Sequence, residues 1–106
     1  MKTEPYKAVV LITESQALHI DLIDLGFVRV GFARTYVYED QDGVINLPES
    51  VADTYDQVIR FVGQTYFNRK MGSEKSRKLH FHMSQQLICR ATEFADRQIE
   101  KMRRKA

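Results

Sequence analysis

The choice between two folds for this chain falls on residues 79–83, Leu79-His80-Phe81-His82-Met83. In the first interpretation they lie in a long helix, because apolar residues recur at helical spacing from here onward. In the second they alternate as a strand does, and Ser84 caps a shorter helix after them. The sequence favours the long helix and leaves the strand as the alternative. The apolar positions of that helix are Leu79, Met83, Leu87, Ala91, Phe94, Ala95 and Met102.

Before this region the sequence predicts a strand followed directly by a helix. Residues 7–12 form a β-branched apolar run that is typical of a buried strand. Thr13 and Gln16 have the spacing of a capping box, so the helix begins after Thr13. We expect it to end at Gly26, since glycine readily adopts the left-handed conformation at a helix C-terminus. The buried face of this helix is expected to hold Leu18, Leu22 and Leu25, with Asp21 and Asp24 pointing away.

The central segment predicts two antiparallel strands and a second helix. Residues 27–38 are expected to be extended throughout, with Gly31 at a bulge. Residues 40–43 form a turn, and residues 44–47 return as the next strand. The helix that follows has an amphipathic stripe, with acidic residues near its start, where the helix dipole favours negative charge. The stripe consists of Val51, Tyr55, Val58, Ile59, Val62 and Tyr66.

Together these elements predict one α+β domain spanning residues 1–106. The expected order is β-α-β-β-α, a small sheet with two helices, followed by a long basic C-terminal helix. If residues 79–83 were a strand, the order would be β-α-β-β-α-β with an added helix, as in a ferredoxin-like sandwich. A chain of 106 residues buries only about two-thirds of the surface that its unfolded form exposes. We therefore expect a homodimer.

Charge divides the chain into two parts of opposite sign. Residues 1–68 carry five basic and ten acidic side chains, whereas residues 69–106 carry eleven basic and four acidic ones. The formal net charge of +2 therefore hides an acidic part and a basic part. Such asymmetry is typical of proteins that bind nucleic acid or an acidic protein surface.

The basic part supplies the candidate binding residues. Basic side chains in loops and tails are well placed to neutralise phosphates, so we predict a small regulatory or accessory protein that binds nucleic acid, DNA or RNA. The alternative is a protein-binding adaptor or inhibitor of a larger complex that recognises its partner through charged surfaces. A third interpretation is a merely solvated basic face. The predicted nucleic-acid-binding residues are Arg69, Lys70, Lys75, Arg77, Lys78, Arg103, Arg104 and Lys105.

Catalytic and metal-binding motifs are weak in this sequence. Residues 38–49 resemble a calcium loop in spacing, but Tyr38 stands where the first carboxylate ligand belongs. His80 and His82 could share a metal only if they lay on a strand. Cys89 has no base beside it in sequence, and we expect it to be a small buried residue. We therefore predict no catalytic residue, no metal and no cofactor; an enzyme would have to use Asp40, Asp42, His80 and His82.

Composition also indicates the cellular compartment in which the protein is expected. The single cysteine suits a reducing environment, and residues 1–5 lack the apolar core of a signal peptide. The longest apolar run, residues 8–12, is far shorter than the roughly 18 residues that a membrane span needs. We expect a cytoplasmic protein that does not enter a membrane.

Overall fold

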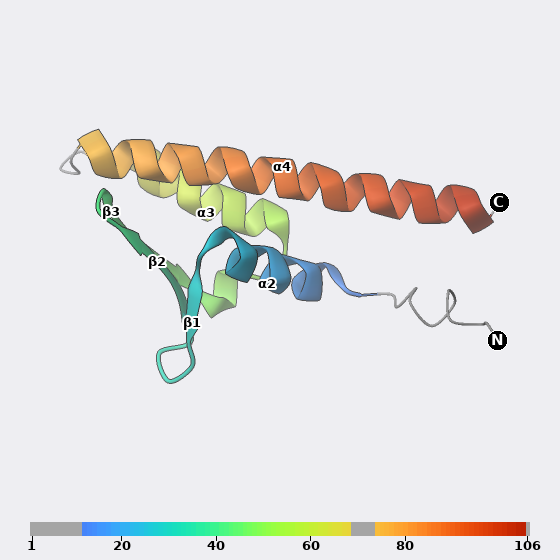
Figure 1. Ribbon diagram of the computed structural model, residues 1–106, viewed down its shortest axis with the longest axis horizontal. Coiled ribbons are helices and arrows are strands. Elements are labelled where there is room, and N and C mark those ends of the chain that lie inside the picture. The colour runs from blue at the N-terminus through green and yellow to red at the C-terminus, as the bar shows by residue number, and fades with distance from the viewer. Residues whose placement is uncertain (1–11, 69–73, 106) are drawn as a thin grey trace.

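The computed structural model describes residues 12–68 and 74–105, and for residues 65–68 and 104–105 the backbone only (Figure 1). Its described part is a mixed α+β fold of three helices and a three-stranded antiparallel sheet, which confirms the predicted class. The strand expected at residues 7–12 lies outside the described residues, apart from Ile12. In chain order the elements are α2 (Glu14–Leu25), β1 (Val28–Val30), β2 (Thr35–Asp40), β3 (Gly43–Pro48), the 3-10 turn η1 (Glu49–Val51), α3 (Tyr55–Asn68) and α4 (Glu74–Lys105).

Residues 79–83 are helical, so the strand alternative, and with it the ferredoxin-like order, is wrong. They lie near the start of α4, a helix of 32 residues. Leu79, Met83 and Leu87 are all buried on one side of it, where α4 packs against α3 and β3. The alternation of residues 79–83 is coincidental, because burial here follows the helical repeat rather than every second residue.

Helix α2 is bounded as its sequence predicts. The Thr13 hydroxyl accepts a hydrogen bond from the backbone N–H of Gln16 (3.1 Å), and the Gln16 side chain accepts one from the N–H of Thr13 (2.8 Å). At the other end Gly26 has a φ of 113°. A Cβ there would also lie 3.0 Å from the Tyr38 ring, so both backbone and packing require glycine.

Residues 27–38 form a hairpin rather than one extended strand. The chain reverses at residues 31–34, and β1 pairs antiparallel with β2, with Val28 opposite Val37. The Arg34 N–H donates to the Gly31 carbonyl (3.2 Å), and Arg34 itself has a φ of 49°. Gly31 therefore belongs to a turn and not to a bulge. The hairpin predicted at residues 40–43 is confirmed, since Asp40 pairs with Gly43 across the β2–β3 turn.

Helix α3 begins later than the amphipathic stripe predicts. Val51 lies in the 3-10 turn η1, and α3 starts at Tyr55. The Thr54 hydroxyl accepts from the N–H of Gln57, while the Gln57 side chain accepts from the N–H of Thr54, both at 3.1 Å. This second capping box has the same spacing as the one that starts α2.

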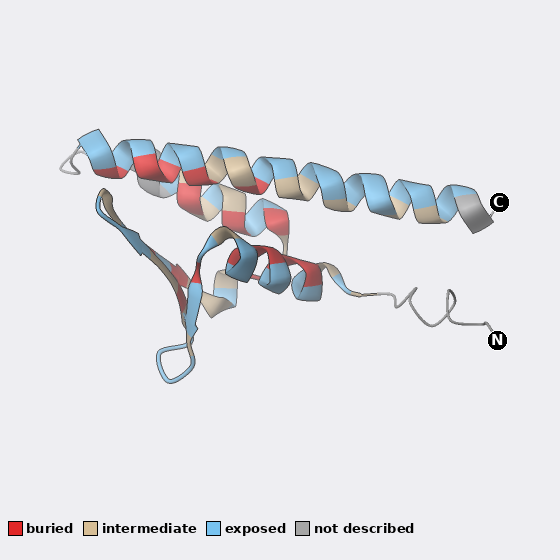
Figure 2. Cartoon of the chain, in the orientation of Figure 1, coloured by how far each residue is buried: buried red, intermediate tan, exposed pale blue. Residues whose placement is uncertain are grey.

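The core lies between one face of the sheet and the three helices. Tyr36, Ile45 and Leu47 supply the sheet side of it, and Leu18, Leu22, Val58, Val62 and Leu87 are fully buried on the helices. Helix α4 continues well past this core (Figure 1). Figure 2 shows that its buried residues stop near the middle of the helix, the last of them with a described side chain being Leu87.

Candidate binding surfaces on helix α4

Helix α4 carries six of the eight predicted binding residues, and it places them at its two ends. Lys75, Arg77 and Lys78, here called the proximal cluster, are exposed in its first turns. The terminal cluster is Arg103, Arg104 and Lys105 in the last turn, where Arg103 is exposed. At about 1.5 Å per residue the clusters lie about 40 Å apart along the helix axis. Arg69 and Lys70 lie outside the described residues.

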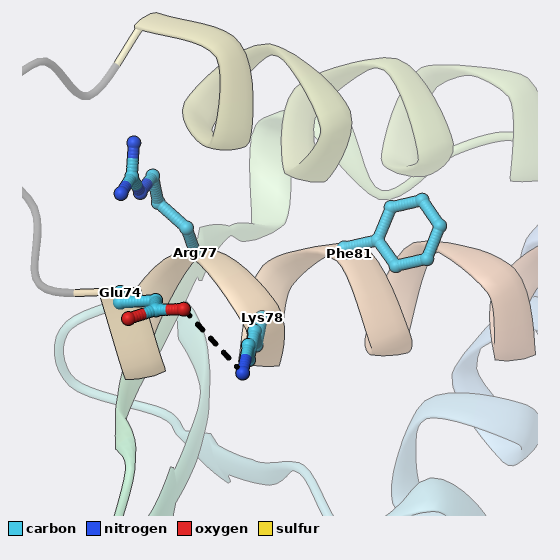
Figure 3. A pocket seen from close by; sticks show the side chains of 4 residues that line it. All are labelled: Glu74, Arg77, Lys78 and Phe81. Atoms are coloured by element: carbon cyan, nitrogen blue, oxygen red, sulfur yellow. Dashed lines mark ion pairs between the residues drawn. The ribbon is translucent and has the colours of Figure 1, made fainter.

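The proximal cluster borders an open hollow of about 410 Å³ lined by Glu74, Arg77, Lys78 and Phe81. Figure 3 shows Lys78 turned toward Glu74 and Arg77 pointing away from that pair. The Lys78 ammonium lies 3.5 Å from the Glu74 carboxylate, and both side chains are more than three-quarters exposed. Such a surface ion pair contributes little to stability, but it offsets one of the three positive charges.

Acidic side chains of the β2–β3 turn lie beside the same end of α4. A Cβ built on Gly43 would be 3.5 Å from the Leu79 side chain and 3.6 Å from the Ser76 hydroxyl, so the turn touches the first turns of the helix. Glu39, Asp40 and Asp42 flank that glycine. The acidic and basic parts of the sequence therefore meet here, and their fields partly cancel.

A polar network ties the middle of α4 to α2 and α3. Arg90 donates to Asp21 (3.0 Å) and to Asp24 (2.6 Å), and the Tyr55 hydroxyl donates to the other oxygen of Asp21 (2.5 Å). The hydrogen bond to Asp24 heads the causes that raise the pKa of Arg90. Burial, and then the bond to Asp21, raises the pKa of Tyr55 well above its ordinary value. Arg90 thus joins α4 to α2, Asp21 extends the network to Tyr55 of α3, and the Arg90 charge is engaged within the chain.

This network corrects the placement of Asp21, which was expected to point away from the core. Asp21 is buried at 9% exposure, beside Leu18 and Leu22. Its position three residues after Leu18 puts it on the same helix face, so the helical repeat alone could have placed it. The pairing with Arg90 bridges 69 positions in sequence, and no local pattern predicts it.

The candidate catalytic and metal-binding residues form no common site. His80 is buried, with Nδ1 2.8 Å from the Ser76 carbonyl, whereas His82 is exposed and bonds Gln86. Because both lie on a helix, they point in different directions. Within residues 12–68 and 74–105, no group of three or more histidine, cysteine, aspartate or glutamate side chains is arranged to hold a metal. Cys89 is exposed, which contradicts the expected burial.

Around and beyond Arg90, α4 exposes a row of mostly apolar side chains, two of which, Ala95 and Met102, belong to the apolar positions predicted for this helix. We call it the distal stripe. Ile88 is 42% exposed, Ile99 48% and Met102 69%, and Thr92 and Ala95 between them are exposed too. Their spacings alternate between four and three residues, the repeat of a helix that packs along a second helix. The distal stripe consists of Ile88, Thr92, Ala95, Ile99 and Met102.

The distal stripe is separate from the face that α4 turns to its own domain. Leu87, Ala91 and Phe94 are buried or half-buried, and the Phe94 ring packs on Tyr55 of α3 with 5.4 Å between ring centres. The spacing from Leu87 to Ala91 and Phe94 repeats that of the stripe one position earlier in sequence, which turns this row by about 100° around the helix. Helix α4 therefore has two apolar rows, one inside the domain and one outside.

Comparisons with protein-family models, with curated proteins and with solved structures found no match to this chain. Among the described residues, no helix combines the length and the apolar character needed to cross a membrane.

Proposed function

We propose that this is a non-catalytic accessory protein that acts by binding another protein, and that residues 88–105 of α4 form the binding surface. The observation that carries this proposal is the distal stripe, in which Ile88, Ile99 and Met102 are each more than two-fifths exposed. A stripe at alternating spacings of four and three residues fits the groove of a partner helix. We also propose a cytoplasmic location, which suits a chain whose one cysteine, Cys89, is free and exposed.

Stability considerations also favour a partner for this part of α4. In proteins most of the stability of a helix comes from packing its apolar face rather than from intrinsic helix propensity. Residues after Phe94 are half-buried or exposed wherever their side chains are described. Packing the distal stripe on a second helix would supply the missing burial.

The test compares two substitutions of the same kind on different helices. Ile99 in the distal stripe and Ile23 on α2 are exposed to nearly the same degree, 48% and 45%. Affinity-tagged wild type, Ile99→Glu and Ile23→Glu proteins are purified from the same cells with nuclease treatment. We expect a stoichiometric protein partner with wild type and Ile23→Glu, and its loss with Ile99→Glu. Equal recovery with all three proteins would contradict the proposal.

A second candidate function is nucleic-acid binding through the terminal cluster. That cluster lies at the far end of α4 from the acidic β2–β3 turn, so its charge is not offset by Glu39, Asp40 and Asp42 as that of the proximal cluster is. Each phosphate contact contributes nearly one unit to the slope of log affinity against log salt for duplex DNA. Binding to a DNA duplex and to a single-stranded RNA is measured by fluorescence anisotropy over a range of salt.

Triple glutamine variants of the two clusters separate their contributions. Replacing Arg103, Arg104 and Lys105 is expected to lower the salt slope by about two to three units. Replacing Lys75, Arg77 and Lys78 is expected to change it by less, because of the nearby carboxylates. Absence of binding to either nucleic acid at low salt removes this candidate and leaves the protein-binding proposal unaffected.

A further inference from the structure

The distal stripe also indicates which partner it fits. Along the stripe, large and small side chains follow one another: Thr92 and Ala95 are small, and Ile99 and Met102 are large. When two helices pair antiparallel, an a position of one faces a d position of the other. If two copies of α4 are aligned so that Ile99 faces Ala95, Met102 automatically faces Thr92. At these two layers each large side chain then meets a small one, as close packing requires, and Ile88 lies outside the paired positions.

We propose that the distal stripe is the contact between two copies of this chain, which pair antiparallel around a twofold axis near residue 97. This inference rests on the proposed function, because it names the partner of the same surface. A parallel, in-register pair would place Ala95 against Ala95, which leaves a gap at that layer. Twofold dimers of this self-complementary kind are the commonest protein oligomers.

The shape of the molecule favours the same arrangement. The sheet, α2 and α3 gather along the first part of α4, and its far end projects beyond them (Figure 1). In an antiparallel pair that overlaps only at the projecting ends, the two folded bodies lie at opposite ends of the dimer. In a parallel pair they would lie at the same end of the dimer.

The antiparallel alignment brings two negative charges close together. Asp96 lies beside the stripe, immediately after Ala95 in sequence, and the twofold axis brings the Asp96 side chains of the two copies to the same side of the seam. Two like charges facing each other oppose association. Replacing Asp96 with Asn should therefore tighten the dimer severalfold, and added salt should tighten it too, since screening weakens the repulsion.

The contact is short, so the dimer should dissociate on dilution. Specific interfaces usually bury roughly 1,200–2,000 Å² in total, and four facing positions on each of two helices make a smaller contact than that. Sedimentation equilibrium is expected to show a mass between 12.4 kDa and twice that value, rising through the micromolar range. Ile99→Glu should weaken association at least tenfold, while Ile23→Glu should leave it unchanged. A monomer at several hundred micromolar would overturn the proposal.

The single native cysteine reports the direction of the two helices. Cys89 is exposed and can carry a nitroxide spin label without any added cysteine. In the antiparallel pair the two labels are separated by at least about 24 Å along the helix axes. In a parallel in-register pair they lie at the same height, on helices only about 10 Å apart. A pulsed-EPR distance of about 25–30 Å that disappears with Ile99→Glu supports the proposal, and a distance below about 20 Å contradicts it.

Failure of the dimer and failure of the proposed function are distinguishable. Tagged and untagged copies of the chain are expressed together, and the tagged copy is purified. If the untagged copy does not follow but Ile99→Glu still loses a different protein, the dimer is wrong and the protein-binding proposal holds. If the untagged copy follows and no other protein depends on Ile99, the dimer holds and the accessory function falls. Far-ultraviolet circular dichroism confirms that every variant is folded.

Discussion

The two halves of α4 are both helical, but they differ in how far their apolar side chains are buried. In residues 74–87 the apolar residues of the helical repeat are buried against the sheet and α3, with Leu79, Met83 and Leu87 all at 7% exposure or less. In residues 88–105 the large residues of the distal stripe are 42–69% exposed. Periodicity therefore predicts a helix in both halves, but the domain covers only Ala91 and Phe94 in the second half and leaves the distal stripe exposed.

Substitutions at matched positions of the two halves should give the largest contrast. Leu87→Ala removes a fully buried side chain and should lower the free energy of unfolding by about 2–5 kcal/mol, because it leaves a cavity. Ile99→Ala removes a half-exposed side chain and should cost the monomer at most about 0.5 kcal/mol. Urea unfolding at low protein concentration measures both values. Similar losses at the two positions would show that the distal half is packed inside the domain.

The polar network at Arg90 marks the boundary between the halves. Arg90→Gln leaves the buried Asp21 without its cationic partner, and the unfolding free energy should fall by about 1–3 kcal/mol. Arg60→Gln is the control, since Arg60 pairs with Asp56 on the exposed face of α3 and should change stability by no more than about 0.5 kcal/mol. Equal effects of the two substitutions would mean that the network contributes little.

Alkaline pH tests the buried member of that network. The pKa of Tyr55 is raised in the folded chain above its ordinary value of 10.0. The stabilisation of the fold by the protonated Tyr55 hydroxyl is therefore complete below pH 10 and is lost as the pH rises above 10. Tyr55→Phe should lower the stability at neutral pH by about 1 kcal/mol, by removing the hydrogen bond to Asp21. It should also make stability fall less steeply above pH 10. A fall as steep as that of wild type would argue against the burial of this hydroxyl.

Helix capping should give the smallest of these effects. Thr54→Ala removes the hydroxyl that accepts from Gln57, and should cost about 1 kcal/mol. Thr13→Ala should cost a similar amount at the start of α2. Both changes should leave the self-association of the distal half unaltered, which analytical ultracentrifugation can verify. A change in dimer affinity with either variant would mean that the stability of the domain affects self-association through the distal stripe, which contradicts the separation seen in the structure.

Local signals in the sequence predicted the local elements well. The Thr13–Gln16 spacing and Gly26 fixed both ends of α2, and the turn at residues 40–43 fixed the pairing of β2 with β3. The same capping spacing at Thr54 and Gln57 would have placed the start of α3 correctly. At residues 31–34 the local pattern was misleading. The alternating apolar residues predicted one strand, but the chain reverses there.

Features that depend on distant residues could not be predicted in the same way. The Arg90–Asp21 pair, and the approach of the acidic β2–β3 turn to the proximal cluster, both depend on how helices and sheet pack. The total charge of residues 69–106 likewise does not show that the proximal and terminal clusters lie at opposite ends of one helix, with Arg90 paired to α2 between them. The distal stripe was visible in the sequence, but only the structure shows that Ile88, Ile99 and Met102 remain outside the core.

Amide hydrogen exchange along α4, measured at low and at high protein concentration, tests the contrast between its halves most directly. We expect residues 74–87 to be protected at both concentrations, because they are packed in the domain. Residues 95–103, which lie beyond the contact of Phe94 with Tyr55, should exchange quickly in dilute solution and become protected as the concentration rises. Uniform protection along the helix, or fast exchange of the distal half at every concentration, would contradict the account.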